Sequence, residues 1–340
     1  MAVKTFKARL EPSGREFSLD ADDSVLNCAL RQRILLQYGC RNGRCSSCKY
    51  FLIDGEVDFG KTSPYCLTDN EKDEGWALLC QARALSDLVI RDQDSSNRDD
   101  AAIITPQDHI AKLASVDRLN ESLWRLQLEL TTPITFYPGQ YIEVEAPGQP
   151  GHWRCYSIAS SPGSPDRIEL IVKRIPGGGF SDQIDRLVRG FELAIRGPYG
   201  MSYLRAADRP VLLVATGSGI APLLSMLRCC AAQNVDRSFQ LYYGARRQSD
   251  LIFLDEIHQL ELLLPRLSFK PTLSALDAGD EWPGAVGRVT QVLQREIPDA
   301  SPYDAYICGQ PEMCESVSTL LLAKGIPENR IFRDDFFAAA

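Results

Sequence analysis

No run of apolar residues in this 340-residue chain approaches the 18 or more that a membrane-spanning helix requires, so we expect no transmembrane segment. The first ten residues, MAVKTFKARL, contain no apolar signal-peptide core, which favours a cytoplasmic protein. An excess of positive charge is also missing, because 37 Lys and Arg face 45 Asp and Glu, giving a net charge of −8. This balance argues against nucleic acid or an anionic membrane as the main partner.

Histidine is scarce, with three residues in the chain, and internal repeats are missing. His109, His152 and His258 stand alone, with no spacing typical of a metal site or of the base that activates a nucleophile. The chemistry of this protein is therefore expected to depend on other residue types, of which cysteine, with eleven residues, is the first to consider.

Three cysteines stand close together in YGCRNGRCSSCKY, residues 38–50, with the spacing C-x4-C-x2-C. A disulfide framework is typical of short secreted chains, and structural zinc sites favour two C-x2-C pairs, of which only Cys45 and Cys48 form one. A plant-type [2Fe–2S] cluster uses this spacing plus one distant cysteine, and Cys80 follows 32 residues after Cys48. We therefore predict that Cys40, Cys45, Cys48 and Cys80 hold such a cluster, with backbone N–H groups of the Gly- and Ser-rich loop directed at its sulfurs.

The pattern of apolar residues divides the chain into three domains. Residues 1–94 predict a small mixed sheet, and the polar stretch within residues 95–106 predicts a linker. Residues 107–206 contain short, evenly spaced strands typical of an antiparallel barrel. Residues 207–340 alternate strands with helices, which predicts a parallel sheet flanked by helices.

Two further motifs carry chemistry. Thr216–Pro222, TGSGIAP, follows a buried-type strand and precedes a helix, which favours dinucleotide binding, although a tight turn requiring positive φ would also explain its glycines. On the barrel, Arg154-Cys155-Tyr156-Ser157 offers a phosphate partner, a flat ring and a hydroxyl. An ordinary strand with a surface Arg and a half-buried Tyr would explain that motif equally well.

In this order the motifs resemble the ferredoxin–NADP reductase superfamily, and in particular the NADH-dependent reductase components of bacterial multicomponent oxygenases. The resemblance implies a β-grasp ferredoxin domain, an FAD-binding antiparallel β-barrel domain and a Rossmann-like nicotinamide domain. It implies an FAD site made of Arg154, Tyr156, Ser157, Gly178, Gly179 and Ser181, with Lys173 either steadying the FAD or facing solvent. It implies a nicotinamide dinucleotide site made of Thr216, Gly217, Gly219, Ala221, Pro222, Cys308, Gly309 and Pro311. Tyr156, Ser157, Cys308 and Phe336 would surround the reacting rings, with Phe336 either covering the flavin face or closing the last strand over the core together with Phe337.

The function implied by this resemblance is electron transfer from NADH through FAD and a [2Fe–2S] cluster to a terminal oxygenase or its ferredoxin. The cluster loop and the ending RIFRDDFF most resemble reductases of soluble di-iron monooxygenases, although reductases of Rieske dioxygenases share the layout. Two alternatives are a reductase for a deoxysugar dehydratase and a redox-sensing iron–sulfur flavoprotein. We expect a monomer that prefers NADH, although Arg246 and Arg247 would suit the 2′-phosphate of NADPH.

Overall fold

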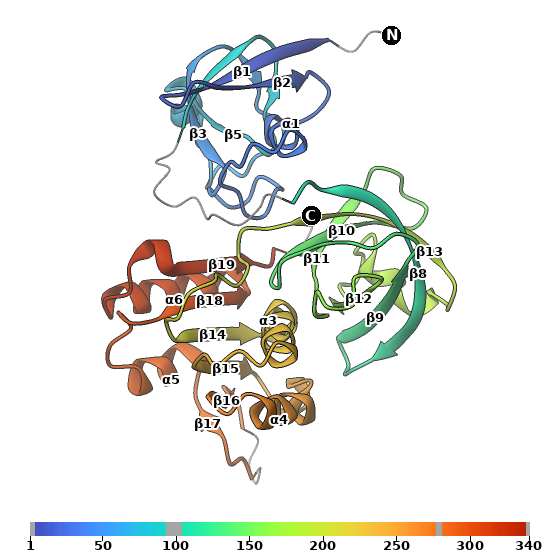
Figure 1. Ribbon diagram of the computed structural model, residues 1–340, viewed down its shortest axis with the longest axis vertical. Coiled ribbons are helices and arrows are strands. Elements are labelled where there is room, and N and C mark those ends of the chain that lie inside the picture. Colours follow the sequence, from blue (N-terminus) through green and yellow to red (C-terminus); the bar gives the residue numbers. More distant parts are fainter. Residues whose placement is uncertain (1–3, 93–103, 277–280, 338–340) are drawn as a thin grey trace. The chain divides into compact units, whose positions relative to one another are not determined.

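The computed structural model describes residues 4–92, 104–276 and 281–337, and the chain divides into two compact units, residues 1–106 and 107–340 (Figure 1). Residues 93–103, which contain most of the predicted linker, lie outside the described residues. The exact domain boundaries given above therefore stay predictions.

The first unit is a mixed five-stranded sheet with the strand order β2-β1-β7-β3-β5, accompanied by the small pair β4-β6. Strands β1 and β2 form an antiparallel hairpin, while β7 pairs parallel to β1. Helix α1 packs against β2 and begins after Ser24, whose hydroxyl accepts the N–H of Asn27 as an N-cap. The elements are β1 Thr5–Glu11, β2 Arg15–Asp20, α1 Val25–Arg31, β3 Lys49–Asp54, β4 Val57–Asp58, α2 Asp69–Asp73, β5 Trp76–Leu78, β6 Arg83–Ala84 and β7 Leu88–Arg91.

The second unit begins with six strands in the order β11-β10-β13-β8-β9-β12, and neighbouring strands are antiparallel. A bridge between Ile158 and Leu170 joins the two outer strands and closes the sheet into the predicted barrel. Inward-facing aliphatic side chains fill the barrel, as the alternation of its strands requires. The elements are β8 Gln107–Arg118, β9 Leu123–Leu130, β10 Tyr141–Glu145, β11 Trp153–Ser157, β12 Arg167–Lys173, the 3-10 helix η2 Ser181–Arg186 and β13 Glu192–Tyr199.

The rest of the second unit is a six-stranded parallel sheet with the order β17-β16-β15-β14-β18-β19. Helices α3 and α4 cover one face and α5 and α6 the other, which gives two apolar cores and explains why the central strands read as continuous apolar runs (Figure 1). The elements are β14 Val211–Thr216, η3 Gly217–Gly219, α3 Ile220–Ala232, β15 Phe239–Ala245, η4 Gln248–Asp250, α4 Leu254–Leu263, β16 Leu267–Leu273, β17 Ala285–Val286, α5 Val289–Glu296, β18 Asp304–Gly309, α6 Pro311–Ala323, η5 Glu328–Arg330 and β19 Ile331–Asp335.

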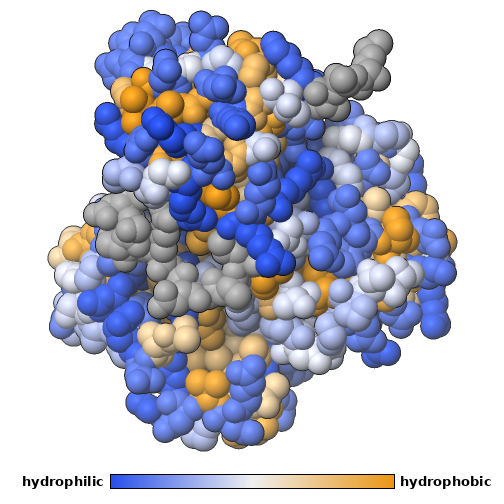
Figure 2. Space-filling view, turned by 45° about the horizontal axis from the view of Figure 1, so that its top comes forward, coloured by the Kyte–Doolittle hydropathy of each residue, from blue (hydrophilic) through white to orange (hydrophobic). Residues whose placement is uncertain are grey.

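Hydrophilic side chains dominate the face drawn in Figure 2, with separate apolar patches between them. Among the described residues, no helix combines the length and apolar character needed to cross a bilayer. The fold class predicted from the sequence, a mixed-sheet domain, an antiparallel barrel and a parallel α/β domain, is confirmed.

Candidate functional site

The four predicted cluster cysteines lie as two hydrogen-bonded pairs, Cys40 with Cys45 and Cys48 with Cys80. The hydrogen bond from Cys40 lowers the pKa of Cys45 to about 6, and the bond from Cys48 likewise lowers the pKa of Cys80. Cys45 also acts electrostatically on both Cys48 and Cys80, so the two pairs are neighbours. Two thiol pairs match a cluster in which each of two irons takes two thiolates.

The chemistry of this donor set, four cysteine thiols, fits the [2Fe–2S] group. The sulfurs also receive backbone hydrogen bonds, from Asn42 and Arg44 at Cys40 and from Gly43 at Cys80. These donors would favour thiolate over thiol, as cluster ligation demands.

Glycine is required at one position of this loop, Gly43, and fits closely at another, Gly39. Gly43 has φ +74°, and a Cβ there would lie 2.5 Å from the carbonyl oxygen of Lys61. A Cβ at Gly39 would lie 3.0 Å from both the Cys45 sulfur and the Ser47 hydroxyl oxygen. Both glycines therefore let the loop close tightly around the cysteines.

The flavin motif lies on β11, the outer barrel strand beside the closing bridge. The Tyr156 ring packs at a tilt against Phe180, with 5.3 Å between ring centroids, and burial raises its pKa. The Arg154 guanidinium is half-buried and donates to the Trp153 carbonyl oxygen at 2.9 Å. Ser157 is buried at the end of the strand. The strand thus presents a cation, a ring and a hydroxyl within four residues, as a bound flavin nucleotide needs.

The second flavin motif, Gly178 to Ser181, forms a tight turn before η2. The Ser181 hydroxyl accepts the N–H of Ile175 at 3.2 Å. A Cβ at Gly178 would lie 2.7 Å from the Ser181 hydroxyl oxygen, and one at Gly179 would lie 2.9 Å from Oε1 of Gln149. The turn accordingly keeps a bare backbone, which a pyrophosphate can approach closely. Lys173 is exposed at the end of β12, and its backbone pairs with Leu123.

The glycine loop joins the end of β14 to α3 and lies against β18. A Cβ at Gly219 would lie 2.1 Å from the Cys308 carbonyl oxygen, so the two segments meet only because residue 219 has no side chain. Gly217 has φ +55°, and its carbonyl oxygen accepts the Tyr243 hydroxyl at 3.1 Å. Ala221 and Pro222 are buried in the first turn of α3, and Pro311 opens α6.

A buried polar atom is left for a ligand at this edge of the sheet. Thr216 Oγ1 has no hydrogen-bond partner among the described residues, and a Cβ at Gly309 would lie only 2.5 Å from it. Buried hydroxyls normally have partners. The site therefore fits a dinucleotide that would supply one, at the carboxyl ends of β14 and β18 where open α/β sheets bind ligands.

The flavin and nicotinamide motifs converge through the last strand. The Ser157 hydroxyl donates to the Asp334 carboxylate at 3.1 Å, and the N–H of Phe336 donates to the Gly309 carbonyl oxygen at 2.7 Å. Cys308 is fully buried, and burial raises the pKa of its thiol. Ser157 bonds to Asp334, Asp334 is the strand partner of Cys308, and Phe336 is held beside Gly309, so these segments meet at one place. Their role around the reacting rings, together with Tyr156, stays a prediction. The sequence interpretation missed Asp334, whose only signal was its position before the paired phenylalanines.

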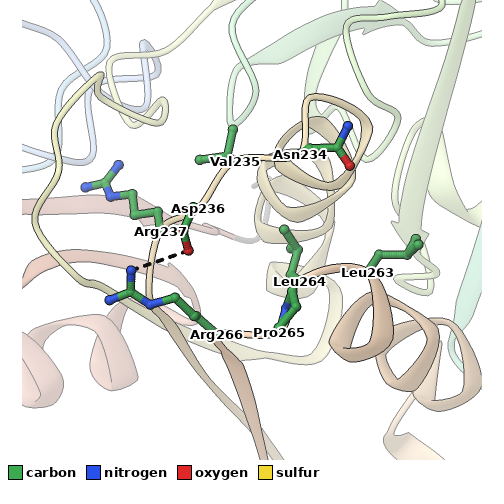
Figure 3. Close-up of a pocket in the computed structure, with 8 residues that line it drawn as sticks. All are labelled: Asn234, Val235, Asp236, Arg237, Leu263, Leu264, Pro265 and Arg266. Atoms are coloured by element: carbon green, nitrogen blue, oxygen red, sulfur yellow. Dashed lines mark hydrogen bonds and ion pairs between the residues drawn. The ribbon is translucent and has the colours of Figure 1, made fainter.

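A pocket of about 350 Å³ lies at the opposite edge of the parallel sheet (Figure 3). It is formed by the turns that precede β15 and β16, and an ion pair between Asp236 and Arg266 joins the two turns. Its lining residues are Asn234 to Arg237 and Leu263 to Arg266. None of the predicted site residues lines it, so the redox chemistry belongs elsewhere.

Comparison with known proteins finds three domains in succession along the chain. Three family models match in succession: a 2Fe-2S iron-sulfur cluster binding domain over residues 8–85, an oxidoreductase FAD-binding domain over 110–203 and an oxidoreductase NAD-binding domain over 213–319. The chain is 35% identical to the reductase component of propane 2-monooxygenase from Mycolicibacterium goodii, covering 97% of both chains. It is 32% identical to the CDP-6-deoxy-L-threo-D-glycero-4-hexulose-3-dehydrase reductase of Yersinia pestis, covering 98% of both chains. The crystal structure of an Amycolatopsis cytochrome P450 reductase superimposes with a TM-score of 0.86 at 29% identity, over 97% of this chain and 98% of that one.

Proposed function

Because the chain belongs to the family of iron–sulfur flavoprotein reductases that contains the reductase components of multicomponent oxygenases, we propose that it delivers electrons from NADH to the terminal component of a monooxygenase. It is an oxidoreductase with FAD-binding, NAD-binding and [2Fe–2S] domains. The observation that carries the monooxygenase assignment is the full-length similarity to propane 2-monooxygenase reductase. We further propose that the protein works as a monomer.

When bound, FAD and the [2Fe–2S] cluster would supply the redox chemistry, which is acceptance of a hydride from NADH, giving NAD⁺, and release of the two electrons one at a time. The protein supplies placement. Arg154, Tyr156 and Ser157 would hold the flavin, while the loop from Thr216 to Pro222 would hold the dinucleotide.

Two residues complete the proposed reaction site. Asp334 fixes the direction of the Ser157 hydroxyl. The hydrogen bond from the Phe336 N–H to the Gly309 carbonyl oxygen fixes the position of the Phe336 backbone. Phe336 would exclude water from the flavin until the nicotinamide displaces its ring.

The proposal is tested with purified holoprotein and NADH. Reduction of ferricyanide and cytochrome c at tens of turnovers per second, on the scale of typical enzymes, is expected. A di-iron hydroxylase of the propane or phenol type, with its own accessory components, should then oxidise substrate only when the reductase is present. Failure to drive that hydroxylase, despite rapid cytochrome c reduction, would overturn the monooxygenase assignment.

A second candidate is a reductase for a sugar-nucleotide dehydrase, favoured by the similarity to the Yersinia pestis protein. Its test is NADH consumption that depends on such a dehydrase and its CDP-sugar. A redox sensor would instead show no sustained NADH turnover with any acceptor.

A further inference from the structure

Helix α3 is shared between the nicotinamide site and the barrel. It begins at Ile220, immediately after the glycine loop, and Figure 1 shows it on the face of the parallel sheet that is covered together with α4. Its buried side chains belong to one apolar core with Leu123, Ala159 and Ile171 of the barrel. The strand β12 also packs against the turn η3 that forms the loop. The glycine loop is therefore packed against strand β12 of the barrel.

Arg228 is the charged centre of this contact. Its Nη1 donates to the Ala159 carbonyl oxygen at 2.7 Å and to Oε1 of Glu169 at 2.8 Å, both in the barrel. Its Nε and Nη2 donate to the carboxylate of Glu256 on α4, at 2.6 and 2.8 Å. The side chain is only 17% exposed. One guanidinium thus joins α3, α4 and the barrel with directed bonds, as its planar fork allows.

Ser225, one turn earlier on the same helix, makes a second directed bond. Its hydroxyl is fully buried and donates to the Ser160 carbonyl oxygen at 2.7 Å. Ala159 and Ser160 follow Ser157, the end of the flavin motif, by two and three residues. Two side chains of α3 therefore hold the chain segment that leaves the flavin site.

We propose that Arg228 is a positioning residue, which holds the glycine loop at the separation from the flavin motif that hydride transfer requires. The proposal rests on the function proposed above, but it concerns only the first half of the reaction, from NADH to FAD. An apolar core alone would let helix α3 slide against the barrel. The bonds of Arg228 to the Ala159 carbonyl oxygen and the Glu169 carboxylate, together with the bond of Ser225 to the Ser160 carbonyl oxygen, fix the distance and the direction of the helix relative to the barrel. A misplacement of about 1 Å can cost about 100-fold in rate, so such fixation has a measurable effect.

The first experiment compares Glu169→Gln with Glu256→Gln, in holoprotein mixed rapidly with NADH. Each change removes the charge of one carboxylate bonded to Arg228, but only Glu169 belongs to the barrel. We expect Glu169→Gln to slow flavin reduction at saturating NADH by about tenfold, while Glu256→Gln changes it less than about threefold. Arg228→Lys keeps the charge but not the fork, and it should resemble Glu169→Gln.

A second pair avoids charge altogether. Ser225→Ala removes the bond to the barrel, whereas Ser318→Ala removes a bond of 2.8 Å to Cys314 of its own helix. Both serines are buried and helical, so their effects on folding should be similar. Ser225→Ala should slow flavin reduction, and Ser318→Ala should not. In apoprotein, amide exchange of residues 220–232 should quicken in Ser225→Ala and Glu169→Gln only.

The outcomes separate the proposal from a purely structural role and from the proposed function. The positioning role would be overturned if the rate of flavin reduction fell equally in the two variants of each pair, Glu169→Gln with Glu256→Gln and Ser225→Ala with Ser318→Ala, in proportion to a lower melting temperature. So would an unchanged rate in Glu169→Gln and Ser225→Ala. Reoxidation of photochemically reduced protein by cytochrome c does not involve this contact and should stay normal in all variants. Failure to drive an oxygenase with normal flavin reduction would instead affect only the proposed function.

Discussion

The Ser157 hydroxyl reaches the Asp334 carboxylate across 3.1 Å, although 177 positions separate the two residues in the chain. Ser157 ends a strand of the barrel, and Asp334 lies in the last strand of the parallel sheet. The bond therefore crosses from the flavin motif to the nicotinamide domain at the place where the two rings would meet.

Removing this hydroxyl should impair hydride transfer without unfolding the protein. We expect Ser157→Ala to slow flavin reduction by NADH about tenfold, equivalent to about 1.4 kcal/mol. The cause is the loss of an oriented hydroxyl together with an Asp334 carboxylate left without this donor. Stopped-flow absorbance of the flavin measures the rate. Asp334→Asn keeps an acceptor oxygen and should have a smaller effect, and Ser316→Ala, on an exposed helix face, serves as control. A normal rate in Ser157→Ala would refute this role.

Replacing a cluster cysteine should separate flavin chemistry from electron delivery. Because Cys80 pairs with Cys48, Cys80→Ser should abolish the [2Fe–2S] EPR signal and visible absorption while FAD stays bound and NADH still reduces it. Cytochrome c reduction should fall at least tenfold. Cys66→Ser is the matched control and should keep the cluster. A normal cluster in Cys80→Ser, or its loss in Cys66→Ser, would show that the ligand assignment is wrong.

The turn after β15 bears on the choice between NADH and NADPH. Arg246 is exposed there, while the Asp250 carboxylate accepts the backbone N–H of Arg247 at 3.0 Å and closes the turn. We expect kcat/KM for NADH to exceed that for NADPH at least tenfold. Arg246→Ala should reduce the remaining NADPH activity and leave NADH activity intact, since only NADPH carries a 2′-phosphate. Equal kcat/KM for the two nucleotides in the wild-type protein would contradict the preference.

Phe336 is half-buried, and its N–H is tethered to the Gly309 carbonyl oxygen. If its ring covers the flavin, Phe336→Ala should change several-fold either the affinity for the nicotinamide nucleotide or the ratio of kcat/KM for NADH to that for NADPH. Flavin fluorescence should be quenched less in this variant, and the melting temperature should change little. Titration with NAD⁺ and thermal unfolding of the same sample test both parts. A ring that only packs against the protein would give the reverse pattern: a lower melting temperature with unchanged affinity and selectivity.

His109 predicts a pH dependence of stability. Burial lowers its pKa below the ordinary value of 6.5, while its Nδ1 lies 2.9 Å from the Thr132 hydroxyl oxygen. The unfolded chain therefore takes up a proton at a higher pH than the folded chain, and the contribution of His109 to stability is lost as the pH falls below about 6.5. Denaturant unfolding from pH 7.5 to 5.5 should show a shallower loss in His109→Gln than in wild type. The exposed His152→Gln is the control, and parallel curves for all three proteins would disprove the effect.

Local features of the sequence predicted much of this molecule. Cysteine spacing, strand alternation and glycine motifs depend on neighbouring residues, so they predicted the three folds, which are confirmed, and the candidate site segments, whose roles stay predictions. Predicting which segments touch would have required information about contacts between residues that are distant in the sequence. Gly219 was expected to face a ligand, yet its contact with Cys308 becomes visible only in three dimensions.

The same limitation hid the residues that join the motifs. Arg228 reads as a single charge on an otherwise apolar helix, and nothing near it in the sequence indicates Glu169, which lies 59 positions away. Asp334 likewise stands in an ordinary strand ending. Both residues bond to partners that are distant in the sequence and brought close by packing, for which sequence periodicity gives no signal.

The strand order of the parallel sheet has a consequence for biosynthesis. Strand β14 lies between β15 and β18, and β19 is added beyond β18, so the sheet and the Asp334 partner of Ser157 are completed last. At about 5–20 residues per second, the barrel, which ends at Tyr199, leaves the peptidyl transferase centre roughly 7–27 s before Asp334. Nascent chains stalled beyond the barrel but before β18 should therefore show a protease-resistant barrel, while the nicotinamide domain is still digested. We therefore expect the barrel to be able to bind FAD during translation, before the nicotinamide domain can bind NADH.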